Sequence, residues 1–255
     1  MDVRVLGCSG TYPSAHVPAS GFLISGTESR VWLDCGTGTF AALQGVVDFV
    51  TVDALMISHL HSDHCLDIFP FYYALRLHPS KPQRFPVYAP PGTRDHLVAL
   101  IAGDNKAIFS EVFDFHEVDG GDTIEVGEIR MEFVRTEHPL PTLACSIRTD
   151  GHRLVYSADS GPGGELATLA NDADSFICEA TYQNGHGGPP LHLSASEAGE
   201  LARRSGVGAL FLTHLFPTLD HRRSQEEAAE AWQQTPVVLE PGMVLRAEHS
   251  GIELV

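Results

Sequence analysis

The strongest constraint in the sequence is an apolar run that ends in a dense polar segment. The run Ala54-Leu55-Met56-Ile57-Ser58 is followed directly by His59-Leu60-His61-Ser62-Asp63-His64. A short β-rich run of this kind predicts a buried strand. Side chains of metal-ligand type this close together would pack poorly in a core, whereas a loop at a strand end lets them converge on an ion. The segment therefore predicts a sheet with a metal site at one strand end, and the alternative is a solvated polar turn.

Three single residues further along the chain repeat this arrangement. Each stands just after the end of an apolar run: His138, Asp159 and His214. In α/β folds, functional groups collect beyond the carboxyl ends of strands. Because one short segment cannot supply all the ligands of two ions, we expect these three residues to join it in a two-ion site.

The rest of the chain predicts short strands with helices between them. The expected strands are Met1–Gly7, Phe22–Ser25, Val31–Asp34, Ala54–Ser58, Val87–Ala89, Thr123–Val126, Ile129–Val134, Cys145–Arg148, Leu154–Ser157, Phe176–Cys178, Leu210–Thr213 and Met243–Arg246. The expected helices are Phe40–Val47, Ile68–Leu77, Thr93–Ala102, Glu165–Ala170, Ala195–Ser205 and Gln225–Gln234. A capping-box signature, Ser194 with Glu197, begins the fifth helix. This order predicts an α/β (α+β) fold with two sheets flanked by helices. No linker divides residues 1–255, so we expect a single domain.

The charge of the chain bears on the size of its substrate. The formal net charge is -17. Nucleic-acid-binding proteins usually carry a basic stripe that displaces counterions from phosphates. The densest basic spots here are only Arg203-Arg204 and Arg222-Arg223. The charge therefore favours a small substrate and disfavours a large nucleic acid as a partner.

Composition and chain ends bear on the compartment. Hydrophobic residues make up 43% and charged residues 19% of the chain, a globular balance. No apolar run approaches the ~20 residues that cross a bilayer. The acidic N-terminus does not resemble a signal peptide, and the five cysteines are scattered without a CxxC pair, which is typical of free thiols. We expect a cytoplasmic protein that does not bind membranes.

The order H-x-H-x-D-H, His, Asp, His resembles the metallo-β-lactamase superfamily, with motifs from the Gly7 loop to Pro217. The resemblance implies a four-layer αββα sandwich that holds two zinc ions at one edge of the sheets. It implies the following ligands: His59, His61 and His138 on the first ion, Asp63, His64 and His214 on the second, and Asp159 between them. Mn²⁺ and Fe²⁺ are alternatives, because such sites accept several metals. Asp34 matches a buried aspartate of the family, and we expect it to orient the ligand segment.

A second motif narrows the resemblance. Pro190-Leu191-His192-Leu193-Ser194-Ala195 resembles the histidine motif of ribonuclease Z and related phosphodiesterases. His192 precedes the predicted helix Ala195–Ser205, whose N-terminus favours an anion. It could hold a phosphate oxygen or protonate a leaving alkoxide, or it could only fix the loop. We expect Asp63 to act in catalysis as well, by steering the proton of the nucleophile.

The chain departs from ribonuclease Z in two places. That enzyme carries a long tRNA-binding arm between the third metal histidine and the bridging aspartate, whereas here His138 and Asp159 are 21 residues apart. The early loop Pro13-Ser14-Ala15-His16-Val17-Pro18 also lacks the basic residues of that enzyme. Short bacterial members described as cyclic-nucleotide phosphodiesterases match better.

We therefore predict a metal-dependent phosphodiesterase that hydrolyses a small diester, such as cyclic AMP. The alternatives are a tRNA 3′-processing endonuclease, a lactonase- or thioesterase-type hydrolase, and a metal-binding protein without catalysis. In the expected pocket loop Thr181–Pro190, Tyr182 could stack on a base and His186 could line the pocket, or both could be ordinary loop residues. The resemblance also implies a homodimer.

Overall fold

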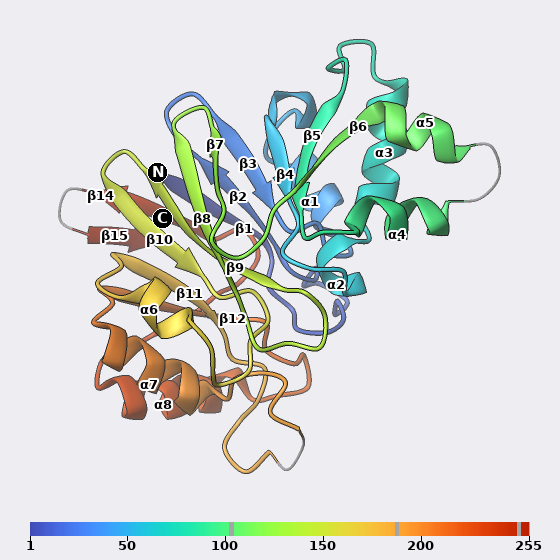
Figure 1. Ribbon diagram of the computed structural model, residues 1–255. Coiled ribbons are helices and arrows are strands. Elements are labelled where there is room, and N and C mark those ends of the chain that lie inside the picture. Colours follow the sequence, from blue (N-terminus) through green and yellow to red (C-terminus); the bar gives the residue numbers. More distant parts are fainter. Residues whose placement is uncertain (102–104, 187–188, 249–250, 255) are drawn as a thin grey trace.

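The computed structural model, which describes residues 1–101, 105–186, 189–248 and 251–254, contains two packed β-sheets with helices on their outer sides (Figure 1). Over the described residues, the first sheet has the strand order β15-β14-β1-β2-β3-β4-β5-β6 and the second has β13-β12-β11-β10-β9-β8-β7. This arrangement confirms the two sheets flanked by helices that the sequence predicted and the αββα sandwich that the family resemblance implied. None of the described helices has the length and apolar character that a membrane span requires.

The elements have the following bounds. The first sheet contains β1 (Asp2–Gly7), β2 (Gly21–Ser25), β3 (Arg30–Leu33), β4 (Ala54–Met56), β5 (Phe85–Ala89), β6 (Phe113–Glu117), β14 (Val244–Glu248) and β15 (Gly251–Leu254). The second contains β7 (Thr123–Val126), β8 (Ile129–Arg135), β9 (Leu143–Thr149), β10 (His152–Tyr156), β11 (Ser175–Glu179), β12 (Ala209–Thr213) and β13 (Val237–Val238). The helices are α1 (Thr39–Gln44), α2 (Ser62–Cys65), α3 (Ile68–Leu77), α4 (Thr93–Leu100), α5 (Asn105–Val112), α6 (Leu166–Ala170), α7 (Ala195–Ser205) and α8 (His221–Trp232), with a 3-10 turn at Phe49–Thr51.

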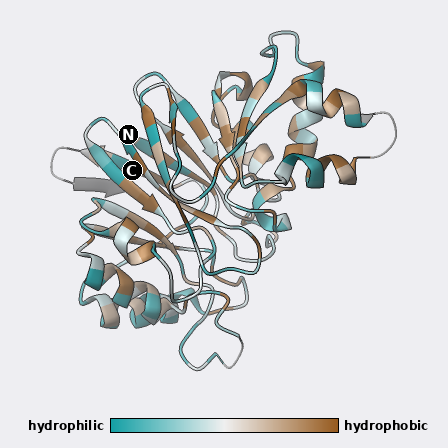
Figure 2. Cartoon of the chain, in the orientation of Figure 1, coloured by the Kyte–Doolittle hydropathy of each residue, from teal (hydrophilic) through white to brown (hydrophobic). Residues whose placement is uncertain are grey.

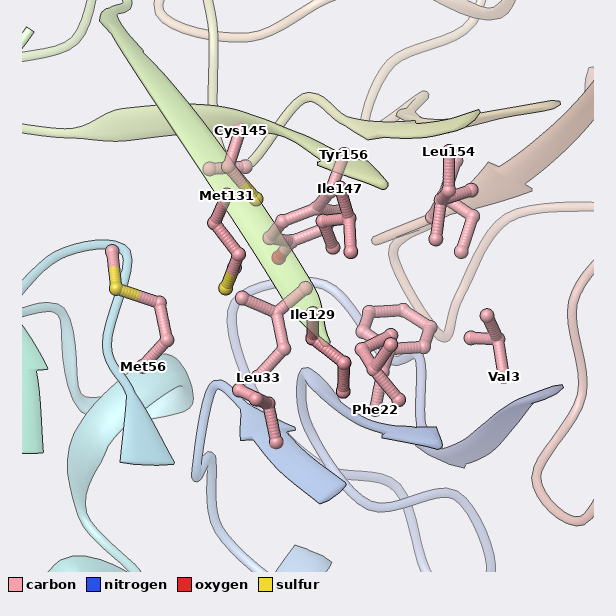
Figure 3. Close-up of a cluster of buried hydrophobic side chains, with 14 of the residues drawn as sticks. Val3, Phe22, Leu33, Met56, Ile129, Met131, Cys145, Ile147, Leu154 and Tyr156 are labelled. Atoms are coloured by element: carbon pink, nitrogen blue, oxygen red, sulfur yellow. The ribbon is translucent and has the colours of Figure 1, made fainter. Parts of the chain in front are cut away.

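The main core lies between the two sheets. Figure 3 shows Val3, Phe22 and Leu33 of the first sheet facing residues such as Ile147 and Leu154 of the second. Successive side chains of a strand point to opposite faces, so every second residue enters this core. Burial of apolar area at roughly 25 cal/mol per Å² makes the contact between the sheets a main source of stability.

The outer faces of the sheets are covered by helices. On β4, Met56 enters the core between the sheets, whereas its neighbour Leu55 packs into a second cluster with Phe71 of α3. A third cluster joins the second sheet to α6, α7 and α8. Figure 2 shows hydrophobic stretches along the strands and hydrophilic ones on the outer turns of α7 and α8. Strands buried on both faces explain why runs such as Ala54-Leu55-Met56 are apolar throughout.

Most elements match the prediction, and the differences have local causes. Helices α3 and α7 have the predicted bounds, and Ser194 and Glu197 form the predicted capping box. The expected start of α8 at Gln225 was wrong, because Asp220 caps the helix and begins it at His221. The sequence did not predict the short helix α2, the helix α5, or the strands β6, β13 and β15. Ala102, the last residue of one predicted helix, lies outside the described residues.

The cysteines are structural. All five lie in the described part of the chain, and each is free and buried. Burial raises the pKa of the Cys8 and Cys65 thiols to about 12. Cys65, which follows His64, belongs to none of the potential metal-ligand groups among the described residues.

Candidate metal centre

The side chains predicted as ligands come together at one edge of the two sheets. Each follows a strand of the sandwich, from β4, β8, β10 and β12. Two groups contain the predicted ligands, a third joins Asp159 and His214 to His192, and within each group the ligand atoms lie within 4.8 Å of one another. The first group is His59, His61, His138 and Asp159, and the second is Asp63, His64 and His214. Part of the first segment forms the turn of helix α2 rather than a loop, and this turn aims Asp63 and His64 at the second group.

Ring nitrogens converge in the first group. His61 Nδ1 lies 3.1 Å from His59 Nε2 and 3.0 Å from His138 Nε2. Burial is the main reason that the pKa values of all three imidazoles are lowered, to about 4 for His138. These rings are therefore neutral at neutral pH, and each has a lone pair to offer a cation.

Asp159 lies between the two groups and faces both. Its Oδ2 is 3.5 Å from His59 Nε2, and its Oδ1 is 3.1 Å from His64 Nε2 and 3.4 Å from His214 Nε2. Burial alone would raise the pKa of Asp159, but the nearby His214, His64 and His59 outweigh it and hold the pKa well below its usual value. The carboxylate therefore stays ionised and offers one oxygen to each group.

The donor set fits divalent metal ions. His64 Nε2 and Asp159 Oδ1 are both buried and have no hydrogen-bond partner. A buried polar atom without a partner costs about 1–3 kcal/mol. Imidazole nitrogens with carboxylate oxygens are the donors that zinc takes in catalytic sites. A cation in each group would satisfy these atoms, and which side chain binds which ion stays a prediction.

A partner at Nδ1 sets the tautomer of four histidines. Proton positions follow from the hydrogen-bond network. The Nδ1 contacts are Ser58 Oγ for His59 (3.1 Å), Asp34 Oδ2 for His64 (2.8 Å), the Leu191 carbonyl for His138 (3.3 Å) and Thr181 Oγ1 for His214 (2.7 Å). In each case Nδ1–H donates outward, so Nε2 faces the site; at His214, this nitrogen also accepts the Thr11 N–H at 3.3 Å.

Asp34 occupies the position predicted for it, behind the ligand segment. It is fully buried, and its Oδ1 accepts the Ser58 N–H at 2.7 Å. Its Oδ2 faces His64 Nδ1 at 2.8 Å, Ser58 Oγ at 2.8 Å and Tyr156 OH at 2.9 Å. Burial would lower the pKa of His64, but the Asp159 and Asp34 carboxylates outweigh it and raise the pKa well above its usual value. A metal ion bound at Nε2 would displace that proton, because ligating histidines are neutral. Asp34 thus links the ligand segment to both sheets.

The backbone turns sharply where it delivers these side chains. Asp34, Ala158 and His214 have positive φ values of 58°, 49° and 59°. Such values are uncommon for residues other than glycine, and they cluster at functional sites. Gly36 permits a close approach, because a Cβ there would lie 1.9 Å from the Asp63 carbonyl oxygen. The chain segments at the site are therefore packed backbone to backbone.

His192 lies beside the ligand groups. Its ring centroid is 5.3 Å from that of His138 and 5.4 Å from that of His214. Its Nδ1 lies 2.9 Å from Glu179 Oε1 and 3.9 Å from Asp159 Oδ2. Burial would lower the pKa of His192, but the hydrogen bond and charge of Glu179 outweigh it and raise the pKa.

The α7 N-terminus differs from the expected anion site. Glu197 closes the first turn with its own carboxylate, and its Oε2 accepts the Ser194 N–H at 2.7 Å. The first helical turn is therefore already partnered by a negative charge. The hydrogen bond that holds His192 is therefore made with Glu179 and not with the N-terminus of α7.

The sequence analysis missed two residues, Glu179 and Thr181. Glu179 is fully buried at the end of β11, and its Oε2 accepts the Thr181 hydroxyl at 2.7 Å. Thr181 Oγ1 in turn accepts His214 Nδ1–H at 2.7 Å. One carboxylate thus positions both His192 and His214. The sequence offered one signal for Glu179, namely its place directly after the apolar run Phe176–Cys178, because the predicted metal ligands also follow apolar runs.

An αββα sandwich with histidine and aspartate ligands gathered at one edge of its sheets is the arrangement of a class of metal-dependent hydrolases. The model of the beta-lactamase superfamily domain matches residues 29–215, so this chain belongs to the metallo-β-lactamase superfamily and is a metallo-hydrolase.

Similar proteins include an uncharacterized protein, a ribonuclease and a probable metallo-hydrolase. An uncharacterized Mycobacterium tuberculosis protein is 36% identical over 222 residues, which cover 84% of this chain and 81% of that one. Ribonuclease Z of Methanopyrus kandleri is 28% identical, with 96% of this chain and 97% of that enzyme covered. The crystal structure of YhfI from Bacillus subtilis, a probable metallo-hydrolase, matches with a TM-score of 0.85 and 27% identity over 95% of this chain and 97% of that one.

Proposed function

We propose that this protein is a dinuclear metal-dependent phosphodiesterase that hydrolyses a small phosphodiester, such as a cyclic nucleotide. The observation that carries the proposal is His192, an imidazole with a raised pKa that is held by a buried carboxylate beside two groups of metal ligands. A protonated imidazole at this place suits the departure of an alkoxide, which is a poor leaving group without a proton.

The proposed metal centre contains two zinc ions, with Mn²⁺ and Fe²⁺ as alternatives. We assign His59, His61 and His138 to one ion, Asp63, His64 and His214 to the other, and Asp159 to both. Bound cations would acidify water and neutralise negative charge on the phosphoryl oxygens.

The side chains supply the proton transfers. Because Glu179 holds His192 Nδ1, the Nε2–H of His192 is free to protonate the leaving oxygen. Asp63 has a pKa held low by His214 and His64, against the effect of burial, so it stays ionised and can orient the attacking water by accepting a hydrogen bond from it.

Support for a small substrate comes from the segment between His138 and Asp159. Strands β9 and β10 form an antiparallel hairpin there that belongs to the second sheet. This segment provides no arm for tRNA. A tRNA-processing nuclease remains the second candidate, because the relative from M. kandleri is named a ribonuclease.

A substrate panel on zinc-loaded protein tests the proposal. Cyclic AMP, bis(p-nitrophenyl) phosphate, precursor tRNA and a lactone or thioester are assayed side by side. We expect hydrolysis of the two small diesters. Cleavage of only the tRNA would favour the nuclease, and activity on only the acyl substrates would refute phosphodiester chemistry. Inactivity of fully metal-loaded protein on every substrate would leave a metal-binding protein without catalysis.

Other proposals rest on the sequence and the family resemblance. We propose a single domain over residues 1–255, a cytoplasmic location and a homodimer. Sedimentation of the purified protein tests the dimer, and a monomer at micromolar concentration would refute it.

A further inference from the structure

A small cavity opens beside His192. Its volume is about 230 Å³, and its lining includes Tyr182, His186, Pro189, Pro190 and His192. Sites for drug-sized ligands have volumes of about 300–1,000 Å³, so this cavity suits one ring system rather than an oligonucleotide. His192 therefore faces two places, the metal-ligand groups and this cavity.

An aromatic wall forms one side of the cavity. The rings of Tyr182 and His186 are stacked, with centroids 3.6 Å apart and an interplanar angle of 10°. The Tyr182 ring meets His192 edge to face at 5.5 Å and 88°. Flat rings of this kind suit a planar aromatic ligand, because π-faces stack on each other with little dependence on sequence or substituent.

Helix α8 and the His192 loop hold this wall in place. Gln183 Nε2 donates to the Asp220 carbonyl at 2.7 Å, the Asn184 N–H donates to Glu227 Oε2 at 2.9 Å, and Arg223 Nη2 donates to the Asn184 carbonyl at 3.1 Å. Tyr182 also pairs with the His192 loop, since its N–H donates to the Leu193 carbonyl at 3.0 Å. The wall is thus organised before any ligand binds, which lowers the entropy lost on binding.

The charge of the cavity selects an uncharged group. Among the described residues that line it, none is Lys or Arg, and Glu197 contributes a carboxylate. A second phosphate would find no Lys or Arg to pair with among these lining residues. The phosphodiester therefore belongs at the metal-ligand groups, and the uncharged part of the substrate belongs in the cavity.

We propose that this cavity binds the nucleobase of the substrate against the stacked rings of Tyr182 and His186. The inference rests on the proposed phosphodiesterase function and names its substrate class, a nucleotide diester. It makes Tyr182 and His186 specificity-determining residues, with His192 at the junction between base and phosphate.

The test compares two probes that differ only in the base, adenosine 5′-monophosphate and ribose 5-phosphate. Calorimetry measures their binding to zinc-loaded wild type, Tyr182→Ala, Tyr182→Phe and His186→Ala. His96→Ala, an exposed histidine on α4, is the matched control. We expect wild type, Tyr182→Phe and His96→Ala to bind the nucleotide about tenfold or more tightly than the sugar phosphate. In Tyr182→Ala and His186→Ala this preference falls, while the affinity for ribose 5-phosphate is unchanged.

Equal affinity of the wild type for both probes would overturn the inference, and so would variants that weaken both probes equally. If Tyr182→Ala does not fold, His186→Ala still tests the inference, because His186 is exposed. Hydrolysis of bis(p-nitrophenyl) phosphate is measured in parallel. A base preference without hydrolysis would refute the proposed function and leave the proposed nucleobase site intact. Hydrolysis without a base preference would refute the nucleobase site and leave the proposed function intact.

Discussion

Asp34→Asn is the sharpest test of how the metal centre is organised. Asp34 has a φ of 58°, and asparagine tolerates this left-handed conformation as well as aspartate does, so backbone strain does not contribute. The amide can still accept the Ser58 N–H through its oxygen. Its NH₂ group then faces three donors, namely His64 Nδ1–H, the Ser58 hydroxyl and the Tyr156 hydroxyl. The substitution therefore changes hydrogen bonding and charge at constant shape.

The size of the effect follows from these contacts. The two hydroxyls can rotate, but the imidazole of His64 can only move its proton to Nε2, which is the atom that faces the site. Loss of such a supporting contact lowers metal affinity by about 10–100-fold. Disruption of a buried charged network also lowers the free energy of unfolding by about 3–5 kcal/mol. Tyr156→Phe removes one of the bonds to the carboxylate, so we expect a smaller loss of about 1.5–3 kcal/mol.

Two measurements check this prediction. Competition with a chromophoric chelator gives the zinc affinity, and guanidinium unfolding of the metal-free protein gives the stability. Asp95→Asn is the control, because that side chain is 86% exposed on α4. If Asp34→Asn bound zinc as tightly as the wild type and the control, Asp34 would not orient His64, and this reasoning would be refuted.

Four further predictions concern other residues. We expect His192→Ala to keep its metal content and lose roughly 10²–10⁴-fold in kcat. Because His192 acts when protonated, we expect activity to fall as pH rises through its raised pKa. Glu179→Gln should shift this fall in the pH–activity profile to lower pH. An unchanged profile would contradict the role of Glu179. Backbone hydrogen bonds from Glu28 and Ser29 lower the pKa of Glu128 from 4.5 to about 2. The ionised Glu128 carboxylate therefore stabilises the fold fully above pH 4.5, and this stabilisation is lost as the pH falls toward about 2. The difference in denaturant midpoint between wild type and Glu128→Gln should close over that range, and a constant difference would argue against this contact. Gly36→Ala places a Cβ 1.9 Å from the Asp63 carbonyl, so we expect lower zinc occupancy and about 1–3 kcal/mol less stability; unchanged metal content would show that the turn can adapt.

Much of the architecture could be predicted from local sequence. Apolar runs predicted the main strands, because strands buried on both faces need uninterrupted apolar residues. The capping pair Ser194 and Glu197 predicted where α7 begins, because both partners lie within one turn. The candidate ligands were identifiable for a similar reason, since histidine and aspartate directly after an apolar strand are rare unless they bind something. Short or atypical elements were missed, such as the two-residue strand β13, whose pairing with β12 depends on the sheet around it.

The organisation of the site was decided by the tertiary structure. Asp34 and Tyr156 are 122 positions apart, and Asp63 and His214 are 151 positions apart, yet each pair is in contact. No local sequence pattern predicts which ring nitrogen of a histidine faces the metal-ligand groups, because that depends on the hydrogen-bond partner of the other ring nitrogen. The pattern at Glu179 could have marked it as a site residue, but its contacts with His192 and Thr181 depend on the tertiary structure. The sequence by itself determined which side chains could bind metal and on which strand ends they stand, whereas only the packed sheets decided how those side chains are oriented and held.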